Sequence, residues 1–245
     1  MTTGNADDGR LAAGIAELAG ALLMEIRASG LVGDELKAAG DAGSHELIVR
    51  ELRTSEPEDA IRSEEASAIL PGTTGRLWIV DPLDGTREFS EPPRNDWAVH
   101  VALLERGALV AGAVALPSVG AVLHTQSPPI LAEASGGPPR IVVSRTRPPA
   151  HAVRLAKRLR GELVPMGSAG AKAMAVVTGA ADIYAHSGGQ YEWDSAAPAA
   201  VATAAGLHVS RLDGSPLGYG AIDPWLPDIL ICRPELAEAV LDACS

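Results

Sequence analysis

Two aspartates, Asp81 and Asp84, follow a short run of apolar strand-forming residues, Trp78 to Val80. The run is typical of a buried strand, so the sequence predicts that both acids lie in the turn where the chain leaves the core. Pro82 stiffens this turn, so the two carboxylates cannot swing apart freely. Crowded carboxylates are tolerated when a cation neutralises them or when each is separately solvated. The stretch therefore predicts either a metal site or an ordinary polar turn.

Two further acids could complete a metal site. Glu64 follows a short expected strand at residues 60–61, and Asp194 opens an Ala-rich expected helix. Mg²⁺ prefers oxygen ligands and is usually held by a few carboxylates together with substrate phosphate. Asp194 is explained equally well as a helix N-cap, and the two roles are compatible. The sequence Leu-Asp-Gly recurs at residues 212–214 without a paired acid, and there it predicts an ordinary turn.

The elements that must position these acids differ between the two halves of the chain. Apolar residues at three- and four-residue steps predict a first helix over residues 11–30, and a second helix is expected over residues 44–53. Because Gly40 and Gly43 precede that second helix, Asp41 is expected in a loop or at an N-cap. The composition of residues 97–126 predicts an antiparallel meander of three strands.

A segment rich in Pro, Gly and Ser, residues 127–140, is the expected boundary between two halves. We expect an α+β half over residues 1–135 and an α/β half over residues 136–245. In the second half, strands are expected at residues 140–145, 162–166, 181–186, 207–210 and 228–233, and helices at 149–159, 168–179 and 194–206.

Composition excludes several classes of protein. The 245 residues carry a formal charge of −11, which disfavours a non-specific nucleic-acid binder but allows a local pocket for a small anion. The only cysteines, Cys232 and Cys244, match neither a redox pair nor a zinc-ligand set. The absence of a long apolar run or a signal-like start predicts a soluble, cytoplasmic protein. The six histidines show no ligand spacing, and His100, inside an apolar strand, is expected to be a hydrogen-bonded core residue.

Four ordered matches carry a family resemblance: Asp41, "SEE" at residues 63–65, "DPLDGT" at 81–86 and "WDSAA" at 193–197. Together they resemble the inositol monophosphatase superfamily of Mg²⁺-dependent, lithium-sensitive phosphatases. The stretches "DWAVHVAL", "VSRTRPPA", "GSAGAKAMAV" and "GGQYEWDSAAPA" are most similar to its CysQ-type 3′(2′),5′-bisphosphate nucleotidases. Residues 116–126 depart from the family pattern because they lack its aromatic residues. The resemblance implies a layered α/β/α/β/α fold and a homodimer.

The resemblance also implies a metal-ligand set of carboxylates and one backbone carbonyl. One Mg²⁺ is expected on Glu64, Asp81 and the carbonyl of Leu83. A second is expected on Asp81, Asp84 and Asp194. Glu65 would lie behind these ligands or bind a third, weaker ion. Such ions would clamp the phosphoryl oxygens and activate water.

The remaining site residues implied are those that activate water and those that contact substrate. Asp41 and Thr86 would orient the attacking water and remove its proton. The expected substrate contacts are Gly85, Thr86, Ser144, Arg145, Ser168, Lys172 and Asp194. For Ser168 a helix cap explains the sequence slightly better than substrate contact, and for Lys172 a solvated charge explains it equally well.

The function implied is removal of the 3′-phosphate from 3′-phosphoadenosine 5′-phosphate in sulfur assimilation, with the sulfated relative as a second substrate. The alternatives within the superfamily are hydrolysis of inositol phosphates or of fructose 1,6-bisphosphate. A non-catalytic metal or nucleotide sensor is a third alternative, against which the presence of both Asp41 and Thr86 argues. No membrane and no nucleic-acid polymer is expected as a partner.

Overall fold

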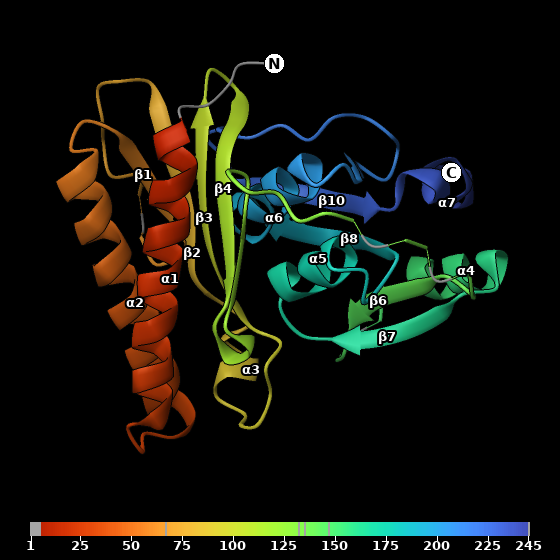
Figure 1. The fold of residues 1–245 in the computed structure, drawn as a ribbon, viewed down its shortest axis with the longest axis horizontal. Coiled ribbons are helices and arrows are strands. Elements are labelled where there is room, and N and C mark those ends of the chain that lie inside the picture. The colour runs from red at the N-terminus through yellow and green to blue at the C-terminus, as the bar shows by residue number, and fades with distance from the viewer. Residues whose placement is uncertain (1–5, 67, 132, 135, 147, 245) are drawn as a thin grey trace.

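The computed structural model describes residues 6–66, 68–131, 133–134, 136–146 and 148–244. Helices and sheets alternate in five layers across the molecule (Figure 1). Helices α1 and α2 cover the outer face of the first sheet, α5 and α6 lie between the two sheets, and α4 and α7 cover the far face of the second. Three apolar clusters fill the spaces between these layers. The predicted layered α/β/α/β/α fold is confirmed.

The first sheet has the strand order β1-β2-β3-β4-β5. β1 runs parallel to β2, and the later neighbours are antiparallel, so the predicted meander is confirmed. Its strands are β1 Ala60–Ser63, β2 Arg76–Asp84, β3 Ala98–Glu105, β4 Ala108–Leu116 and β5 Ala121–His124. The helices of this half are α1 Ala6–Ala28, α2 Gly33–Ser55 and the short α3 Thr86–Phe89.

The second sheet has the order β7-β6-β8-β10-β9 and is mixed. β6 is parallel to both β7 and β8, whereas β10 is antiparallel to β8 and β9. Its strands are β6 Arg140–Ser144, β7 Glu162–Met166, β8 Ile183–Tyr191, β9 His208–Ser210 and β10 Trp225–Cys232. The helices are α4 Ala150–Leu159, α5 Ala169–Val177, α6 Glu192–Ala204 and α7 Ala237–Cys244, of which α7 was not expected.

The second helix begins earlier than the sequence predicts, so the expected place of Asp41 in a loop or at an N-cap is wrong. Asp41 lies inside α2, which starts at Gly33. The glycines that suggested a break serve close packing instead: a Cβ added at Gly40 would lie 2.8 Å from Phe89 Cε1 and 2.9 Å from Leu83 Cδ2. Tertiary contact therefore overrides the low helix propensity of glycine here.

We expect Gly40→Ala to destabilise the protein by roughly 1–3 kcal/mol, because the added methyl group overlaps Phe89 and Leu83 in a packed core. Gly14→Ala is the matched control, since nothing lies within 4 Å of a Cβ added there in α1. That variant should be neutral or stabilised by up to about 1 kcal/mol. Urea denaturation of both variants measures the difference, and equal effects would contradict the packing role of Gly40.

Three expected boundaries of elements near the candidate site are also wrong. β2 continues through Asp84 rather than ending at Val80, with a register shift between Asp81 and Asp84. β8 continues to Tyr191, beyond the expected end at residue 186, and α6 starts at Glu192. β2 and β8 are longer than expected because they remain paired with β3 and β10 at residues that the local sequence pattern assigns to turns.

The predicted ordinary turn at residues 212–214 is confirmed. Asp213 accepts hydrogen bonds from the N–H of Ser215 at 2.9 Å and from its hydroxyl at 2.6 Å. The expected boundary at residue 135 falls on a position outside the described residues, and the last strand of the first sheet and the first strand of the second lie on either side of it.

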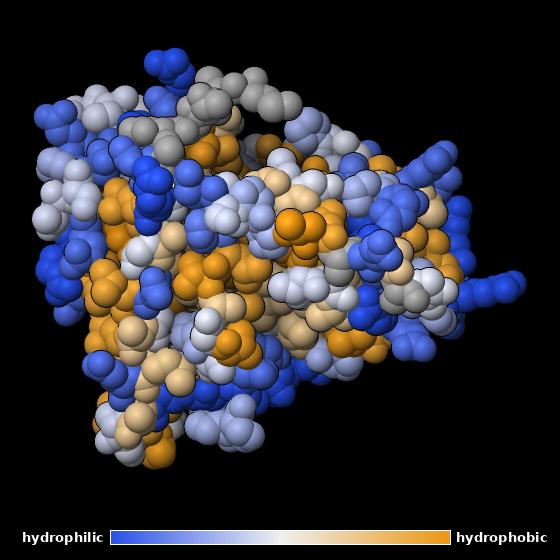
Figure 2. All heavy atoms as spheres, in the orientation of Figure 1, coloured by the Kyte–Doolittle hydropathy of each residue, from blue (hydrophilic) through white to orange (hydrophobic). Residues whose placement is uncertain are grey.

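The described helices include none that is both long and apolar enough to cross a membrane. Figure 2 shows hydrophobic residues exposed over the middle of one face and hydrophilic residues along its rim. Single exposed apolar residues are normal on folded proteins, so this surface alone assigns no partner.

Candidate metal centre and adjoining cavities

Three buried side chains at the end of β2 and the start of β3 form a group that could hold a metal ion: Asp81, Asp84 and His100. One potential ligand atom from each lies within 4.8 Å of the others. In the β2–β3 ladder Asp81 pairs with His100, and after the register shift Asp84 pairs with Ala98. The irregular pairing therefore keeps both carboxylates beside the same imidazole.

The carboxylate of Asp84 is bound by the start of α5. Its oxygens accept hydrogen bonds from the N–H groups of Ala169 at 3.1 Å and Gly170 at 2.6 Å, and from the hydroxyl of Ser168. Burial alone would raise the pKa of Asp84, but the hydrogen bond and charge of His100, the charge of Lys172 and the hydroxyl of Ser168 lower it to about 2. The N–H groups at the start of a helix attract an anion, and in α5 the Asp84 carboxylate is that anion.

The other acids of the centre are crowded, and Asp81 and Asp194 each accept only one backbone N–H, from Leu83 and from Tyr191. Burial and the negative charges of Glu64, Asp84 and Asp194 raise the pKa of Asp81 well above its usual value. Removal of water from the Glu64 carboxyl, with the charges of Asp194 and Asp84, raises its pKa to about 7. The pKa of Asp194 rises to about 6 through burial and the charge of Asp84.

These shifts test whether a metal ion fits. Each raised pKa means that the folded protein disfavours the charged form of that carboxyl. A divalent cation would reverse this, because it binds ionised oxygens and cancels their repulsion. Clustered carboxylates of this kind suit a hard divalent cation such as Mg²⁺, and two of the expected ligands, Asp81 and Asp84, belong to the candidate group with His100.

His100 is the hydrogen-bonded core residue that the sequence predicts, but its place in this centre was not expected. Its ring is fully buried, as expected, and Nδ1 donates to the carbonyl of Trp193 at 3.0 Å. Nε2 lies 3.3 Å from Oδ2 of Asp84. Burial lowers the pKa of His100, but Asp84 and the Trp193 carbonyl more than compensate and raise it. Only the β2–β3 register could have revealed its partner, since the two residues lie in different strands.

Asp194 does not cap α6 in the expected way. It is the third residue of the helix rather than its N-cap, which is Tyr191. One carboxylate oxygen accepts the N–H of Tyr191 at 2.6 Å, the reciprocal contact of a capping box. Because this bond uses a single oxygen, the same carboxylate can cap the helix and face the acids of the centre.

Asp41 and Thr86 come together from α2 and α3. The hydroxyl of Thr86 lies 3.4 Å from Oδ1 of Asp41 and 3.1 Å from the carbonyl oxygen of Leu83. Burial, with the negative charge of Glu65, raises the pKa of Asp41 to about 6. Glu64 and Glu65 follow β1, and both residues are exposed overall, although the Glu64 carboxyl is close enough to Asp81 to form a hydrogen bond with it. Through the Thr86 hydroxyl, the expected water-activating pair of Asp41 and Thr86 contacts the Leu83 carbonyl, which is an expected metal ligand.

Ser168 and Lys172 lie on the first turn of α5. Ser168 caps the helix, since its hydroxyl accepts the N–H of Ala171 at 2.9 Å, and the same hydroxyl donates to Asp84. Lys172 is buried, so the explanation of a solvated charge is wrong. Its ammonium donates to the carbonyls of Gly167, at 3.1 Å, and Ser168, and burial lowers its pKa.

Arg145 follows β6 and is engaged by two carboxylates. It contacts Glu88 at 2.5 Å and Glu91 at 2.8 Å. Glu88 is buried, whereas Glu91 is 44% exposed. A phosphate could reach the guanidinium most readily by replacing Glu91, because removing the buried Glu88 would leave an unpaired charge.

Two cavities open beside the acids and share Ser144, Ser168 and Lys172. The larger, about 520 Å³, also contacts Asp84, Asp194 and several aromatic residues of β8 and β10. The smaller, about 350 Å³, also contacts Gly85, Thr86 and Arg145. The fold thus brings all of the expected substrate contacts to two adjoining spaces, with Lys172 as a cation common to both.

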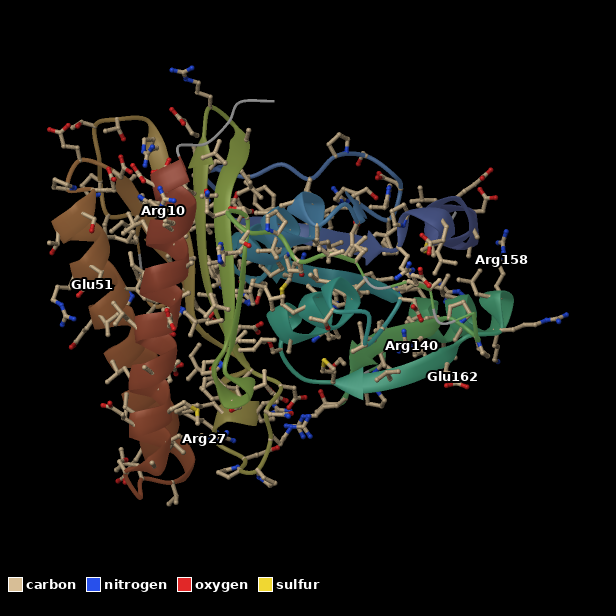
Figure 3. The ribbon with its side chains drawn as sticks, viewed as in Figure 1. Arg10, Arg27, Glu51, Arg140, Arg158 and Glu162 are labelled. Atoms are coloured by element: carbon tan, nitrogen blue, oxygen red, sulfur yellow. The ribbon has the colours of Figure 1, made fainter. Side chains whose placement is uncertain are left out.

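Arg27 fixes α3 from the opposite side. Figure 3 shows this side chain extending from one end of α1 toward α3. Its guanidinium donates to the hydroxyl of Ser118 at 3.1 Å and to the carbonyl of Glu88 at 3.3 Å. It also lies over the rings of Phe89 and Trp97, at 5.9 and 5.5 Å. These contacts hold the short helix that carries Thr86.

The chain is similar to known proteins whose names describe the same kind of phosphatase. A protein from Mycobacterium bovis named 3′-phosphoadenosine 5′-phosphate phosphatase is 49% identical over 240 residues, covering 93% of this chain and 89% of that protein. A protein from Escherichia coli named 3′(2′),5′-bisphosphate nucleotidase CysQ is 32% identical over 197 residues, covering 74% of this chain and 78% of that protein.

The fold has relatives among solved structures. The crystal structure of inositol monophosphatase II from Staphylococcus aureus superposes with a TM-score of 0.78 at 20% identity, covering 95% of this chain and 91% of that one. The sequence also matches the description "Inositol monophosphatase family" over residues 11–129 and 132–243. The predicted membership is confirmed: the chain belongs to the inositol monophosphatase family.

Proposed function

We propose that this protein removes the 3′-phosphate from 3′-phosphoadenosine 5′-phosphate in a reaction that depends on Mg²⁺. The observation that carries the proposal is the position of the acids: Asp84 and Asp194 line a cavity of about 520 Å³ whose other walls include half-exposed aromatic rings. Acids that can hold a cation beside aromatic faces suit a phosphate joined to a nucleoside. The names of the relatives at 49% and 32% identity support the same substrate class.

The ion would be held by the carboxylates of Glu64, Asp81 and Asp194, with the Leu83 carbonyl and Asp84 completing two sites. A divalent cation there would supply Lewis-acid chemistry, polarising the phosphoryl group and favouring ionisation of the attacking water. Glu65 lies next to Glu64 and would attract a further, more weakly held ion. Two or three ions are proposed on this basis.

Asp41 and Thr86 perform the proton chemistry in this proposal. The Thr86 hydroxyl lies between Asp41 and the Leu83 carbonyl, so it can accept from a water molecule and orient that water toward phosphorus. The Asp41 carboxylate takes the proton as the water oxygen bonds to phosphorus. The bond from phosphorus to the 3′-oxygen breaks, the leaving oxygen takes a proton from solvent to become the 3′-hydroxyl, and Asp41 returns its proton to solvent.

The remaining groups hold the substrate rather than the reacting atoms. Gly85 and Thr86 line the smaller cavity together with Ser144, and Ser168 and Lys172 face both spaces. We assign the second phosphate to the neighbourhood of Lys172 and Arg145, where it would replace Glu91 on the guanidinium. Metal ligands bind any phosphate, so these residues and the aromatic walls must provide the choice of substrate.

A comparison of phosphate release tests the proposal. We expect Mg²⁺-dependent hydrolysis of 3′-phosphoadenosine 5′-phosphate at a kcat/KM at least about 100-fold above that for inositol 1-phosphate and fructose 1,6-bisphosphate. The reason is that a site contacting base and second phosphate gains binding energy that the sugar phosphates lack. EDTA should abolish release and lithium should reduce it. Preference for either sugar phosphate would refute the substrate, and release that persists in EDTA would refute the metal dependence.

A further inference from the structure

A buried ion pair joins the first sheet to the start of α6, beside the candidate metal centre. Arg62 lies in β1 and Glu192 is the first residue of α6, and their side chains are 5% and 1% exposed. The guanidinium donates to the Glu192 carboxylate through one nitrogen and to the carbonyl of Ala221, at 2.6 Å, through another. The second Glu192 oxygen accepts the N–H of Gly220 at 2.6 Å. Both charges are thus paired and hydrogen-bonded inside the protein.

Each member of the pair lies two residues before an expected metal ligand. Arg62 precedes Glu64, and Glu192 precedes Asp194. The N–H of Glu64 donates to the carbonyl of Val80 at 3.3 Å, so the pairing of β1 with β2 continues beyond the last residue of β1. Side chains two positions apart in a strand lie on the same face, which places the Glu64 carboxyl on the side of β1 that Arg62 presents to α6. Asp194 is close enough for its charge to raise the pKa of Glu64.

The ion pair is better suited to fixing geometry than to adding stability. Taking two charges out of water costs several kcal/mol, and their attraction does little more than offset that cost. A guanidinium fork that is hydrogen-bonded on both sides, however, allows few arrangements of its partner carboxylate. β1 is the edge strand of the first sheet, whereas α6 packs mainly on β2, β3 and β4. The contact between Arg62 and Glu192 therefore links this edge to the start of α6, which the main packing of the helix does not do.

We propose that Arg62 and Glu192 are positioning residues of the metal centre, whose ion pair fixes the separation of Glu64 and Asp194 and thereby the affinity for Mg²⁺. This inference rests on the metal centre of the proposed function and adds two residues that bind neither ion nor substrate themselves. Without the ion pair, repulsion between the Glu64 and Asp194 carboxylates would move β1 and α6 apart. A cation would then have to draw the two elements together, and this would reduce its binding free energy.

The test removes both charges at once, in Arg62→Met/Glu192→Gln, because removing either alone would leave a buried charge without a partner. The glutamine keeps an oxygen for the N–H of Gly220. We expect the Kd for Mg²⁺, measured by calorimetry at pH 8, to rise about 10- to 100-fold. At saturating Mg²⁺, kcat should return to within about 3-fold of that of the unaltered protein, because the ion again holds the carboxylates in place. Arg62→Lys, which keeps the charge but lacks the planar fork, should raise the Kd by a smaller factor.

Arg140→Met/Asp182→Asn is the matched control. It removes an ion pair of the second sheet, 3.0 Å long, without leaving a charge unpaired, and the asparagine keeps an oxygen for the N–H of Arg140. Arg140 begins β6, whereas Ser144, which lines both cavities, ends it. Thermal denaturation in EDTA measures the damage to the fold in each double variant. We expect the control to change the Kd for Mg²⁺ by less than about 2-fold, whatever its loss of stability.

The outcomes separate this inference from the proposed function. If the Kd for Mg²⁺ rises equally in the two double variants, or in neither, the inference is wrong although the proposed function stands. If Arg62→Met/Glu192→Gln does not fold, Arg62→Lys is compared with the control, and an unchanged Kd in it refutes the inference. If the unaltered protein binds no Mg²⁺, the metal centre fails and this inference fails with it. If it binds Mg²⁺ but releases no phosphate from the nucleotide, the proposed substrate is wrong and the inference stands on the Kd values.

Discussion

Asp84→Asn is expected to lower phosphate release from 3′-phosphoadenosine 5′-phosphate by about 10³-fold and to destabilise the protein by roughly 3 kcal/mol. Both effects come from one carboxylate. Asp84 accepts hydrogen bonds from the hydroxyl of Ser168 and from the N–H groups of Ala169 and Gly170. Asparagine has one acceptor oxygen and no charge, so its NH₂ group would face a donor of α5.

The loss of activity has a separate cause. Asp84 lies within 4.8 Å of ligand atoms of Asp81 and His100, and it carries the lowered pKa of about 2 that keeps it ionised at neutral pH. Removing this charge lowers the affinity of the centre for a cation. It also weakens the hydrogen bonds that hold the start of α5, and with it Ser168 and Lys172, in position. Activity measured at saturating Mg²⁺ and thermal denaturation together resolve the two contributions.

Asp213→Asn is the matched control, because Asp213 occupies the same Leu-Asp-Gly sequence in an exposed turn. We expect it to retain full activity and to change stability by less than about 0.5 kcal/mol. If the Asp84→Asn variant were as active as Asp213→Asn, the assignment of Asp84 to the metal centre would be wrong. Equal stability of the two variants would contradict the role of Asp84 in holding α5.

Mg²⁺ is expected to raise the denaturation temperature much more at pH 8 than at pH 5. The pKa of Glu64 is raised to about 7 and those of Asp41 and Asp194 to about 6, and burial with the charges of the neighbouring acids raises that of Asp81 as well. A carboxyl with a raised folded-state pKa binds its proton more tightly in the folded protein than in the unfolded chain. In EDTA, its ionisation therefore lowers stability as pH rises from about 4 to about 7.

Magnesium should reverse this loss because it binds the ionised carboxylates. At 100 times its Kd, an ion stabilises the folded state by about 2.7 kcal/mol, which corresponds to roughly 5–10 °C in a chain of this size. At pH 5 protons occupy the same oxygens, and the shift should be small. His151 and His186 have pKa values lowered by burial, so their contribution to stability grows as pH rises through about 6.5. The difference between Mg²⁺ and EDTA at each pH cancels that contribution.

Asp81→Asn provides the control for this measurement. The variant keeps an oxygen for the N–H of Leu83, which Oδ1 of Asp81 accepts at 3.0 Å. It should be more stable than the unaltered protein in EDTA at pH 8, by about 2–4 °C for each kcal/mol of repulsion removed, and should respond weakly to Mg²⁺. A Mg²⁺ shift of the same size at both pH values, or in Asp81→Asn, would contradict the assignment of the site.

Much of the fold could be predicted from local patterns. The first helix, expected over residues 11–30 and found over residues 6–28, the meander of β3 to β5 and the alternation of strands and helices after residue 140 all have strong periodicity, and each is present. The errors lie where close packing or strand pairing overrides propensity. Gly40 and Gly43 suggested a break in a helix that continues through both, because Gly40 packs against Phe89 and Leu83.

The sequence by itself determined the family, the acids and their order, because the spacing of Asp81 and Asp84 after an apolar strand and the later Asp194 are local features of the chain. Only the tertiary structure decided which hydrogen-bond donors and charged groups lie against these acids. It placed His100 against Asp84 and directed the start of α5 onto the same carboxylate. These outcomes depend on strand register and on contacts between residues far apart in the sequence, and no periodicity within a segment encodes them.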